Sequence, residues 1–99
     1  MITHHRTADI ASGKTIAAMR YAQEVSAYIK SKTGNEVRFE MPVGGNPYRL
    51  RWTFHHVDLA ALDAFTMSLR SDPAYMKLLE KNADHFIEGS ATDEYWRTV

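Results

Sequence analysis

The sequence predicts an α+β domain in which two helices cover one face of a four-stranded antiparallel sheet. Two observations lead to this fold class. Segments typical of strands and helices follow one another in the order β-α-β-β-α-β, which is the order of a split βαβ plan. The second helical segment is interrupted by Ser71-Asp72-Pro73, so that helix should be kinked near Pro73. The 99 residues contain no repeat or linker and should form one domain, 1–99.

The first half of the chain holds two predicted strands and one long helix. Ile2–Ile10 mixes β-branched and polar residues, as strands do, although nothing in it tells which face points inward. A helix should run from a cap at Ser12 to about Lys32, with Gly34 just past its end. Glu36–Met41 alternates apolar and polar residues and predicts a half-buried strand. The helix carries one buried stripe, formed by Ala18, Met19, Ala22, Val25, Ser26 and Ile29.

The third predicted strand, Pro47–His56 (PYRLRWTFHH), has two unlike faces and follows a Gly44-Gly45 turn. Burying its large apolar groups should gain about 1.5 to 3 kcal/mol each. Burying two unpaired guanidiniums would cost several kcal/mol per charge. We therefore expect one face, Tyr48, Leu50, Trp52 and Phe54, to pack under the helices, and the other face, Arg49, Arg51, Thr53 and His55, to point away from them.

The second half of the chain should contain the kinked helix and a last strand. Asp58 is a suitable N-cap for the first part of the helix, and Asp72 with Pro73 for the second part. Tyr95–Val99 reads as a short strand. Aromatic residues on a strand are usually core residues, and on this ground we expect burial of Phe39, Trp52, Phe54 and Trp96.

Composition limits the partners of the chain. Twelve basic and twelve acidic residues balance, so we expect no binding to nucleic acid or to an anionic membrane. There is no cysteine, which is consistent with a reducing compartment. No apolar run approaches the ~20 residues of a membrane span, and the N-terminus is too polar for a secretory signal. We expect a soluble, cytoplasmic protein.

The uncovered face of the predicted sheet suggests self-association. In the ferredoxin-like plan both helices lie on the same side of the sheet. A chain of 99 residues buries too little surface to leave an entire sheet face bare. We expect a homodimer in which two sheets face each other and together resemble a barrel.

These elements give the chain a resemblance to the dimeric α+β barrel superfamily, and within it to antibiotic-biosynthesis-monooxygenase-like and NIPSNAP-like domains. The resemblance covers nearly the whole chain. It rests on the element order, on PYRLRW after a Gly-Gly turn, and on the kinked helix SLRSDPAYMKLLEKNADHF. Members of the superfamily include cofactor-independent oxygenases, haem-degrading enzymes, isomerases, decarboxylases and proteins without known activity. The resemblance therefore implies a fold far better than a function, and it supplies no catalytic motif to carry over.

Five histidines raise the question of a metal or haem site. Neighbours in His4-His5 and His55-His56 point to opposite faces of their strands. With the first and third strands as parallel neighbours, His5 should lie level with Trp52 and about 10 Å from His55. Metal ligands must converge within ~2.1 Å of one ion, so we expect no metal. His85 is the best haem ligand in the chain, but its place near a helix C-terminus has an electrostatic explanation, and we expect no cofactor.

The polar face of the third strand is the predicted site. Arg51 would hold an oxyanion, Arg49 and Thr53 would support the ligand, and His55 would transfer a proton. The alternative is that these groups form ion pairs between subunits, with Arg38, Glu40, Glu88 or Glu94 beside them. Two functions follow. One is a small-molecule-binding barrel, such as a cofactor-independent oxygenase or isomerase acting on a small planar oxygen-bearing organic compound. The other is a non-catalytic dimerising domain.

Overall fold

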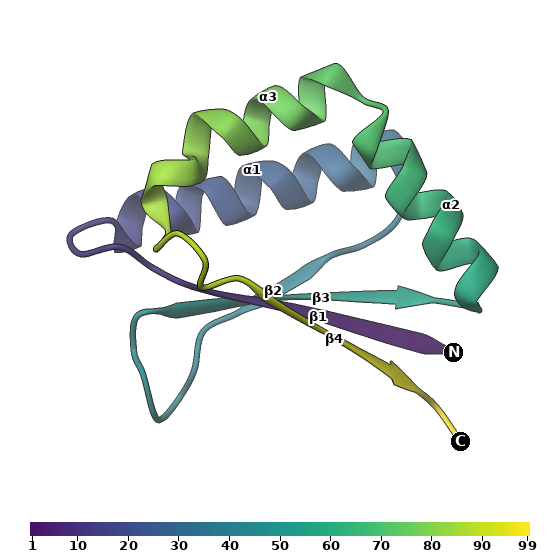
Figure 1. The fold of residues 1–99 in the computed structure, drawn as a ribbon, viewed down its shortest axis with the longest axis horizontal. Helices are drawn as coiled ribbons and strands as arrows, with labels where there is room; N and C mark the ends of the chain where they lie inside the picture. The colour runs from purple at the N-terminus through teal and green to yellow at the C-terminus, as the bar shows by residue number, and fades with distance from the viewer.

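A single sheet with helices on one side forms the architecture of the computed structural model, which describes residues 1–99 (Figure 1). The four strands have the spatial order β2-β3-β1-β4, and every neighbouring pair is antiparallel. This arrangement confirms the predicted fold class. Its elements are β1 (Ile2–Asp9), α1 (Thr15–Thr33), β2 (Arg38–Glu40), β3 (Arg49–His56), α2 (Leu59–Arg70), α3 (Pro73–Asn82), a 3-10 helix (Ala83–His85) and β4 (Thr92–Arg97).

The pairing of β1 with β3 corrects one expectation. The two strands are antiparallel, with His5 opposite Thr53 and Thr3 opposite His55. The crossover through α1 brings the chain back in the direction of β1, and the turn after β2 then reverses it before β3 begins. Strands β1 and β3 must therefore run in opposite directions, and the expectation that they are parallel was wrong.

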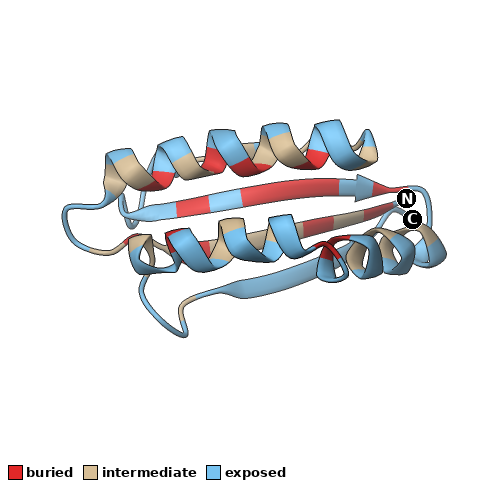
Figure 2. Ribbon diagram, turned by 90° about the horizontal axis from the view of Figure 1, so that it is seen from above, coloured by how far each residue is buried: buried red, intermediate tan, exposed pale blue.

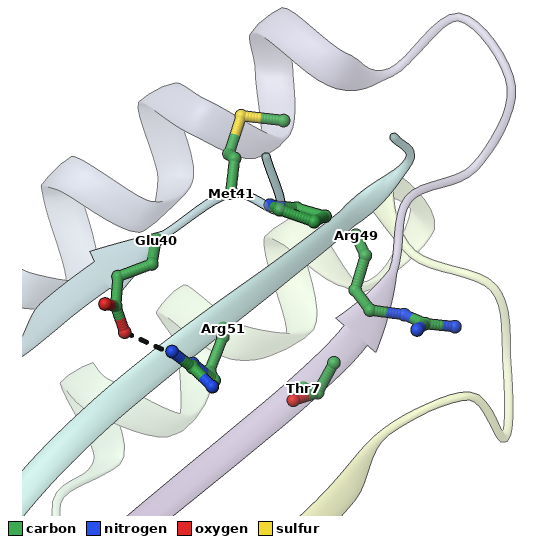
Figure 3. Close-up of a pocket in the computed structure, with 6 residues that line it drawn as sticks. Thr7, Glu40, Met41, Arg49 and Arg51 are labelled. Carbon is green, nitrogen blue, oxygen red and sulfur yellow. Dashed lines mark hydrogen bonds and ion pairs between the residues drawn. The ribbon is translucent and has the colours of Figure 1, made fainter. Parts of the chain in front are cut away.

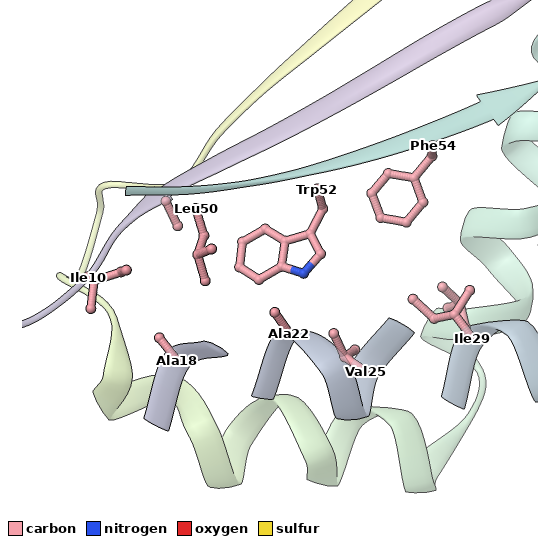
Figure 4. Packing of buried hydrophobic residues seen from close by; sticks show 10 residues of the cluster. Ile10, Ala18, Ala22, Val25, Ile29, Leu50, Trp52 and Phe54 are labelled. Atoms are coloured by element: carbon pink, nitrogen blue, oxygen red, sulfur yellow. The ribbon is translucent and has the colours of Figure 1, made fainter. Parts of the chain in front are cut away.

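The core lies between β3 and α1 (Figure 4). Leu50, Trp52 and Phe54 are buried on the helix side of β3, as the alternation of the strand predicts. The helix contributes small side chains at Ala18 and Ala22, which let the indole of the strand approach the helix closely. Because each large side chain gains about 1.5 to 3 kcal/mol on burial, this contact decides which face of β3 is inside.

Three other predicted core positions are not in the core. Tyr48 is 57% exposed because it lies in the turn before β3 begins at Arg49. Met19 lies at the margin of the buried stripe of α1 and is 38% exposed. Trp96 is 60% exposed, because β4 starts three residues earlier than predicted and its pairing with Thr3 turns the indole away from the helices.

The ends of the helices agree with the predicted capping residues in all but one case. Asp58 accepts from the Ala61 N–H, and Gly34 ends α1 with φ 79°, a conformation that glycine adopts without strain. Ser12 is not a cap, because α1 begins at Thr15 and its N-cap residue is Lys14, which makes no capping hydrogen bond through its side chain. The prediction of Ser12 was therefore wrong.

The predicted kink is present as a joint between α2 and α3, and the two helix axes diverge visibly there (Figure 1). The Asp72 side chain accepts hydrogen bonds from the N–H groups of Ala74 and Tyr75. Pro73 occupies the first turn of α3, where its missing N–H costs no helical hydrogen bond. The joint lets α3 return along α1 while α2 covers the end of the sheet.

Strand β4 lies outside the area that the helices cover (Figure 2), and all six of its residues are exposed. The helix-side surface of β4 is therefore open along α2 and α3, which gives the space beneath these helices access to solvent. None of the helices has the length and apolar character that crossing a membrane requires.

Candidate functional site

The predicted site residues lie on the free face of the sheet, which is the face away from the helices. The guanidinium Nε of Arg49 lies 2.8 Å from Asp9 Oδ1 on β1. That of Arg51 lies 3.2 Å from Glu40 Oε1 on β2. Each arginine thus has a carboxylate partner within its own chain, and both remain more than two-fifths exposed.

Only two of the four predicted residues line a cavity on this face. Arg49 and Arg51 line a cavity of about 240 Å³ (Figure 3). Thr53 is 1% exposed and donates to Glu40 at 3.0 Å, so it faces no cavity. His55 is four residues beyond Arg51, about 13 Å along an extended strand, and its Nδ1 lies 3.3 Å from Thr3 Oγ1. The other residues of the cavity are Thr7, Glu40, Met41 and Pro42.

Glu40 forms hydrogen bonds with two of the polar side chains on the free face, Arg51 and Thr53. Burial raises its pKa, but hydrogen bonds from Thr53 and Arg51 outweigh burial, and the pKa of Glu40 lies below its usual value. The carboxylate is therefore ionised at neutral pH and holds Arg51. His5 Nδ1 lies 3.0 Å from Thr53 Oγ1 and extends the network to β1. That Arg49, Arg51, Thr53 and His55 bind a ligand stays a prediction.

A second site, which the sequence did not indicate, lies between the sheet and the helices α2 and α3. This helix-side cavity has a volume of about 300 Å³ and combines a polar wall with an apolar one. The polar wall includes His4, Arg6 and Asp93, and the apolar wall includes Phe65 and Leu69. A cavity of this size with few convergent polar groups is typical of a small-molecule site. Its remaining residues are Phe54, Thr66, Arg70, Tyr75, Met76, Leu79 and Tyr95.

Asp93 on β4 binds two side chains of β1. Its carboxylate receives two hydrogen bonds from Arg6, at 2.8 Å from Nε and 3.1 Å from Nη2. His4 Nε2 lies 2.9 Å from the same carboxylate. The three side chains meet because β1 and β4 pair with His4 opposite Tyr95 and Arg6 opposite Asp93, on the helix side of the sheet.

The protonation states of this pair follow from its surroundings. Burial raises the pKa of Asp93, but hydrogen bonds from Arg6 and His4 outweigh it and hold the pKa below its usual value. Burial lowers the pKa of His4, and the hydrogen bond to Asp93 offsets this only in part. At neutral pH the carboxylate is charged and can only accept, so His4 Nε2 carries the proton and Nδ1 keeps a lone pair.

The imidazole of His4 is held in one orientation by two aromatic rings. Its centroid lies 5.0 Å from that of Phe54 and 4.4 Å from that of Tyr95, and both rings stack on it. Stacking on both sides and a hydrogen bond at Nε2 leave His4 little freedom to rotate. A neutral, fixed imidazole at the wall of a cavity is suited to accept a proton from a bound molecule.

The sequence held one signal for this site. His4 and Arg6 share a face of β1 with Ile2 and Ala8, which are buried in the core. Two polar side chains on a core-facing strand need partners. Asp93 could not be assigned as that partner, because it is 87 residues from Arg6 in the chain.

No group of three potential protein ligands is close enough to hold a metal ion. His4 and His5 lie on opposite faces of β1, as their adjacency predicts. His85 Nε2 lies 2.9 Å from Asn82 Oδ1 at the end of α3. The residue that the sequence suggested as the best haem ligand is therefore hydrogen-bonded to a neighbouring side chain.

Comparison with known proteins places the chain by its fold. No family model and no curated protein sequence matches it. A NIPSNAP domain protein from Burkholderia xenovorans aligns with a TM-score of 0.84 at 16% identity, over 100% of this chain and 95% of that one. A NIPSNAP-family protein of unknown function from Agrobacterium tumefaciens gives 0.81 at 20% identity, over 97% and 86%.

A third solved structure extends the comparison to the other group named by the resemblance. An antibiotic-biosynthesis-monooxygenase-like protein from Deinococcus radiodurans aligns with a TM-score of 0.74 at 10% identity, over 100% of this chain and 93% of that one. All three likenesses span essentially the whole domain at low identity. This chain therefore has the fold shared by NIPSNAP-family and antibiotic-biosynthesis-monooxygenase-like proteins.

Proposed function

We propose that this protein binds a small planar oxygen-bearing organic compound in the helix-side cavity and transfers a proton to and from it. The observation that supports this proposal is the pair of buried His4 and partly exposed Asp93 at the wall of a cavity of about 300 Å³ with aromatic sides. A flat ring fits between aromatic and aliphatic side chains, and polar groups at one wall orient it. The proposal thus moves the ligand from the free face, where the sequence suggested it, to the opposite side of the sheet.

The proposed chemistry is proton abstraction next to a carbonyl group. His4 Nδ1 takes a proton from the carbon atom, and the electron pair of the broken C–H bond moves toward the carbonyl oxygen to form an enolate. Arg6 leaves Nη1 free of Asp93 and supplies positive charge near this oxygen. Return of the proton to a different carbon atom completes an isomerisation. An oxygenase would instead pass electrons from the enolate to dioxygen as its second substrate.

Deuterium exchange tests this proposal with a defined probe. The protein is incubated with 2-tetralone in D₂O, and loss of the C1 proton signal is followed by NMR. We expect the wild-type protein to accelerate exchange above the buffer rate and His4→Gln to remove most of the acceleration. His5→Gln, on the opposite face of the same strand, is the matched control. Equal rates for wild type and His4→Gln would contradict the role of His4.

Self-association through the free face is a separate proposal. We infer that a second copy of the chain covers this face, because it combines the 60% exposed indole of Trp96 with surface-exposed ion pairs on β2 and β3. Exposed Trp and Arg side chains are enriched at protein–protein interfaces. The helix-side cavity lies on the other side of the sheet and would remain accessible in such a dimer.

A further inference from the structure

The free face of the sheet carries a cavity that the proposed function does not use. This free-face cavity has a volume of about 240 Å³ and is lined by Thr7, Glu40, Met41, Pro42, Arg49 and Arg51. It lies at the start of β3, whereas Trp96 pairs with Thr3 at the other end of the sheet. Asp9, the partner of Arg49, is six residues beyond Thr3 on β1, which is roughly 20 Å along a strand. The cavity and the exposed indole therefore lie at opposite ends of the free face.

Both guanidiniums in this cavity are bound to the chain through one nitrogen only. Arg49 binds Asp9 through Nε at 2.8 Å, and Arg51 binds Glu40 through Nε at 3.2 Å. Arg6, on the helix side of the sheet, instead binds its carboxylate through both Nε and Nη2. The Nη1 and Nη2 groups of Arg49 and Arg51 therefore keep their N–H donors for another acceptor, while the bond at Nε fixes the direction of each guanidinium.

The strand geometry brings these donors to one place. Arg49 and Arg51 are alternate residues of β3, so their side chains leave the same face about 7 Å apart. Thr7 on β1 is the pairing partner of Arg51, and Figure 3 shows its side chain between the two guanidiniums. A hydroxyl can donate as well as accept a hydrogen bond. Three donor groups from two neighbouring strands thus line one cavity.

The charges around the cavity favour an anion. Each of the two cavity arginines has one carboxylate partner. Arg38 on β2 is a third guanidinium, and its Nε lies 3.7 Å from Glu40 Oε2, on a carboxylate that Arg51 already binds. Three guanidiniums thus share two carboxylates. Glu94, another acid on the free face, belongs to β4 and is two strands away from β3.

We propose that the free-face cavity binds a phosphoryl group, whose oxygens accept hydrogen bonds from the Nη groups of Arg49 and Arg51 and from the Thr7 hydroxyl. A phosphoryl group offers at least three oxygens, so both guanidiniums and the hydroxyl can bind it at once. A planar carboxylate offers only two. Met41 and Pro42 form a wall beside the donors, against which the organic part of a phosphomonoester would pack. This ligand differs from the one proposed for the helix-side cavity, and its binding does not depend on that site.

Titration with inorganic phosphate and with phenyl phosphate, at constant ionic strength, tests the site. In ¹H–¹⁵N spectra the Nε–H signals of Arg49 and Arg51 and the backbone signal of Thr7 report on the cavity. The indole signal of Trp96 is the control at the other end of the face. We expect both ligands to shift the cavity signals to saturation and to leave the indole signal unchanged. Either order of affinities supports a phosphoryl site. Tighter binding of phenyl phosphate identifies an organic phosphomonoester as the ligand, and equal affinity identifies free phosphate.

Matched variants separate a built site from the general charge of the face. Arg49→Gln and Arg38→Gln each remove one positive charge, but only Arg49 lines the cavity. We expect Arg49→Gln to weaken phosphate binding about tenfold or more, the effect of lost charge-assisted hydrogen bonds, and Arg38→Gln by no more than about twofold. Arg49→Lys keeps the charge without the fork and should restore only part of the affinity. Thr7→Val keeps the branched shape and should weaken binding about two- to tenfold.

The alternative occupant of the cavity is a carboxylate of a second copy, so sedimentation velocity is measured on the same variants. If neither ligand shifts the cavity signals to saturation, the phosphoryl site is refuted, and a smaller dimer fraction in Arg49→Gln would then assign the guanidinium to the second copy. Equal weakening by Arg49→Gln and Arg38→Gln would also refute the site. Retained phosphate binding in Trp96→Glu, together with its loss in Arg49→Gln, supports a site built within one chain.

Discussion

The hydroxyl of Tyr28 on α1 donates a hydrogen bond of 2.5 Å to Asp72, the residue that caps α3. This bond fastens the joint between α2 and α3 to the long helix. The hydrogen bond from Tyr28 lowers the pKa of Asp72, and the same bond raises the pKa of Tyr28. The position of α3, which forms one wall of the helix-side cavity, therefore depends on a contact between residues 44 positions apart in the chain.

Removing the hydroxyl of Tyr28 should destabilise the attachment of α3 to α1. We expect Tyr28→Phe to lower the thermal midpoint by a few degrees, because it breaks the bond to Asp72 and leaves the ring in place. Asp72→Ala should lower it further, since the N–H groups of Ala74 and Tyr75 also lose their acceptor. Differential scanning calorimetry measures both. Equal midpoints for Tyr28→Phe and wild type would show that the contact contributes nothing in solution.

Replacing the proline at the joint should have little effect. Pro73 is in the first turn of α3, where no helical hydrogen bond uses its nitrogen. We expect Pro73→Ala to change the free energy of unfolding by no more than about 1 kcal/mol, measured by urea denaturation. A much larger loss would mean that the fixed φ of proline, and not the Asp72 cap, holds the joint.

Stability should fall on mild acidification because of two buried histidines. Burial lowers the pKa of both His4 and His56 below the value of 6.5 that the unfolded chain has. Between the folded and unfolded pKa values the unfolded state binds more protons, so the free energy of unfolding decreases as the pH falls through about 6.5. Asp93 has a lowered pKa as well, and its contribution is lost only below about pH 3.8.

The variant His56→Leu isolates one of these groups. His56 is 5% exposed, its Nε2 has no partner, and its ring packs on Phe65 at 4.9 Å. We expect the thermal midpoint of His56→Leu to fall less between pH 7.5 and 5.5 than that of the wild type. The same slope in both proteins would rule out His56 as the titrating group.

The variant Arg51→Ala tests which face of the sheet binds the ligand. We expect it to leave 2-tetralone binding unchanged, because Arg51 lies on the free face and pairs with Glu40. We expect it to weaken self-association, because it removes a charged partner from the proposed interface. Calorimetric titration and sedimentation velocity give the two readouts. Loss of ligand binding with an intact dimer would return the ligand site to Arg49, Arg51, Thr53 and His55.

Self-association through the free face should double the mass of the protein in solution. We expect light scattering to give about twice the chain mass of 11.3 kDa. Trp96→Glu should shift the mass toward one chain, since it places a charge where an apolar contact is expected. Tyr95→Glu alters the adjacent residue, which faces the helix side, and should leave the mass unchanged. A wild-type mass of one chain at all concentrations would contradict the dimer.

The sequence by itself determined the order of the elements and the inner face of β3. Alternation places Leu50, Trp52 and Phe54 on one side, and the cost of burying Arg49 and Arg51 leaves only one orientation. The cap at Asp72 followed by Pro73 determined the helix joint in the same way. Each of these features depends on residues close together in the chain, so a local pattern is enough to reveal it.

Only the tertiary structure decided the register of the strands and the assembly of the helix-side site. Trp96 faces away from the helices because β4 pairs with β1 in a register that its short apolar pattern does not specify. His4, Arg6 and Asp93 meet because the first and last strands are neighbours in the sheet. Pairing between the ends of a chain depends on how the whole sheet closes, and no local spacing of residues encodes it.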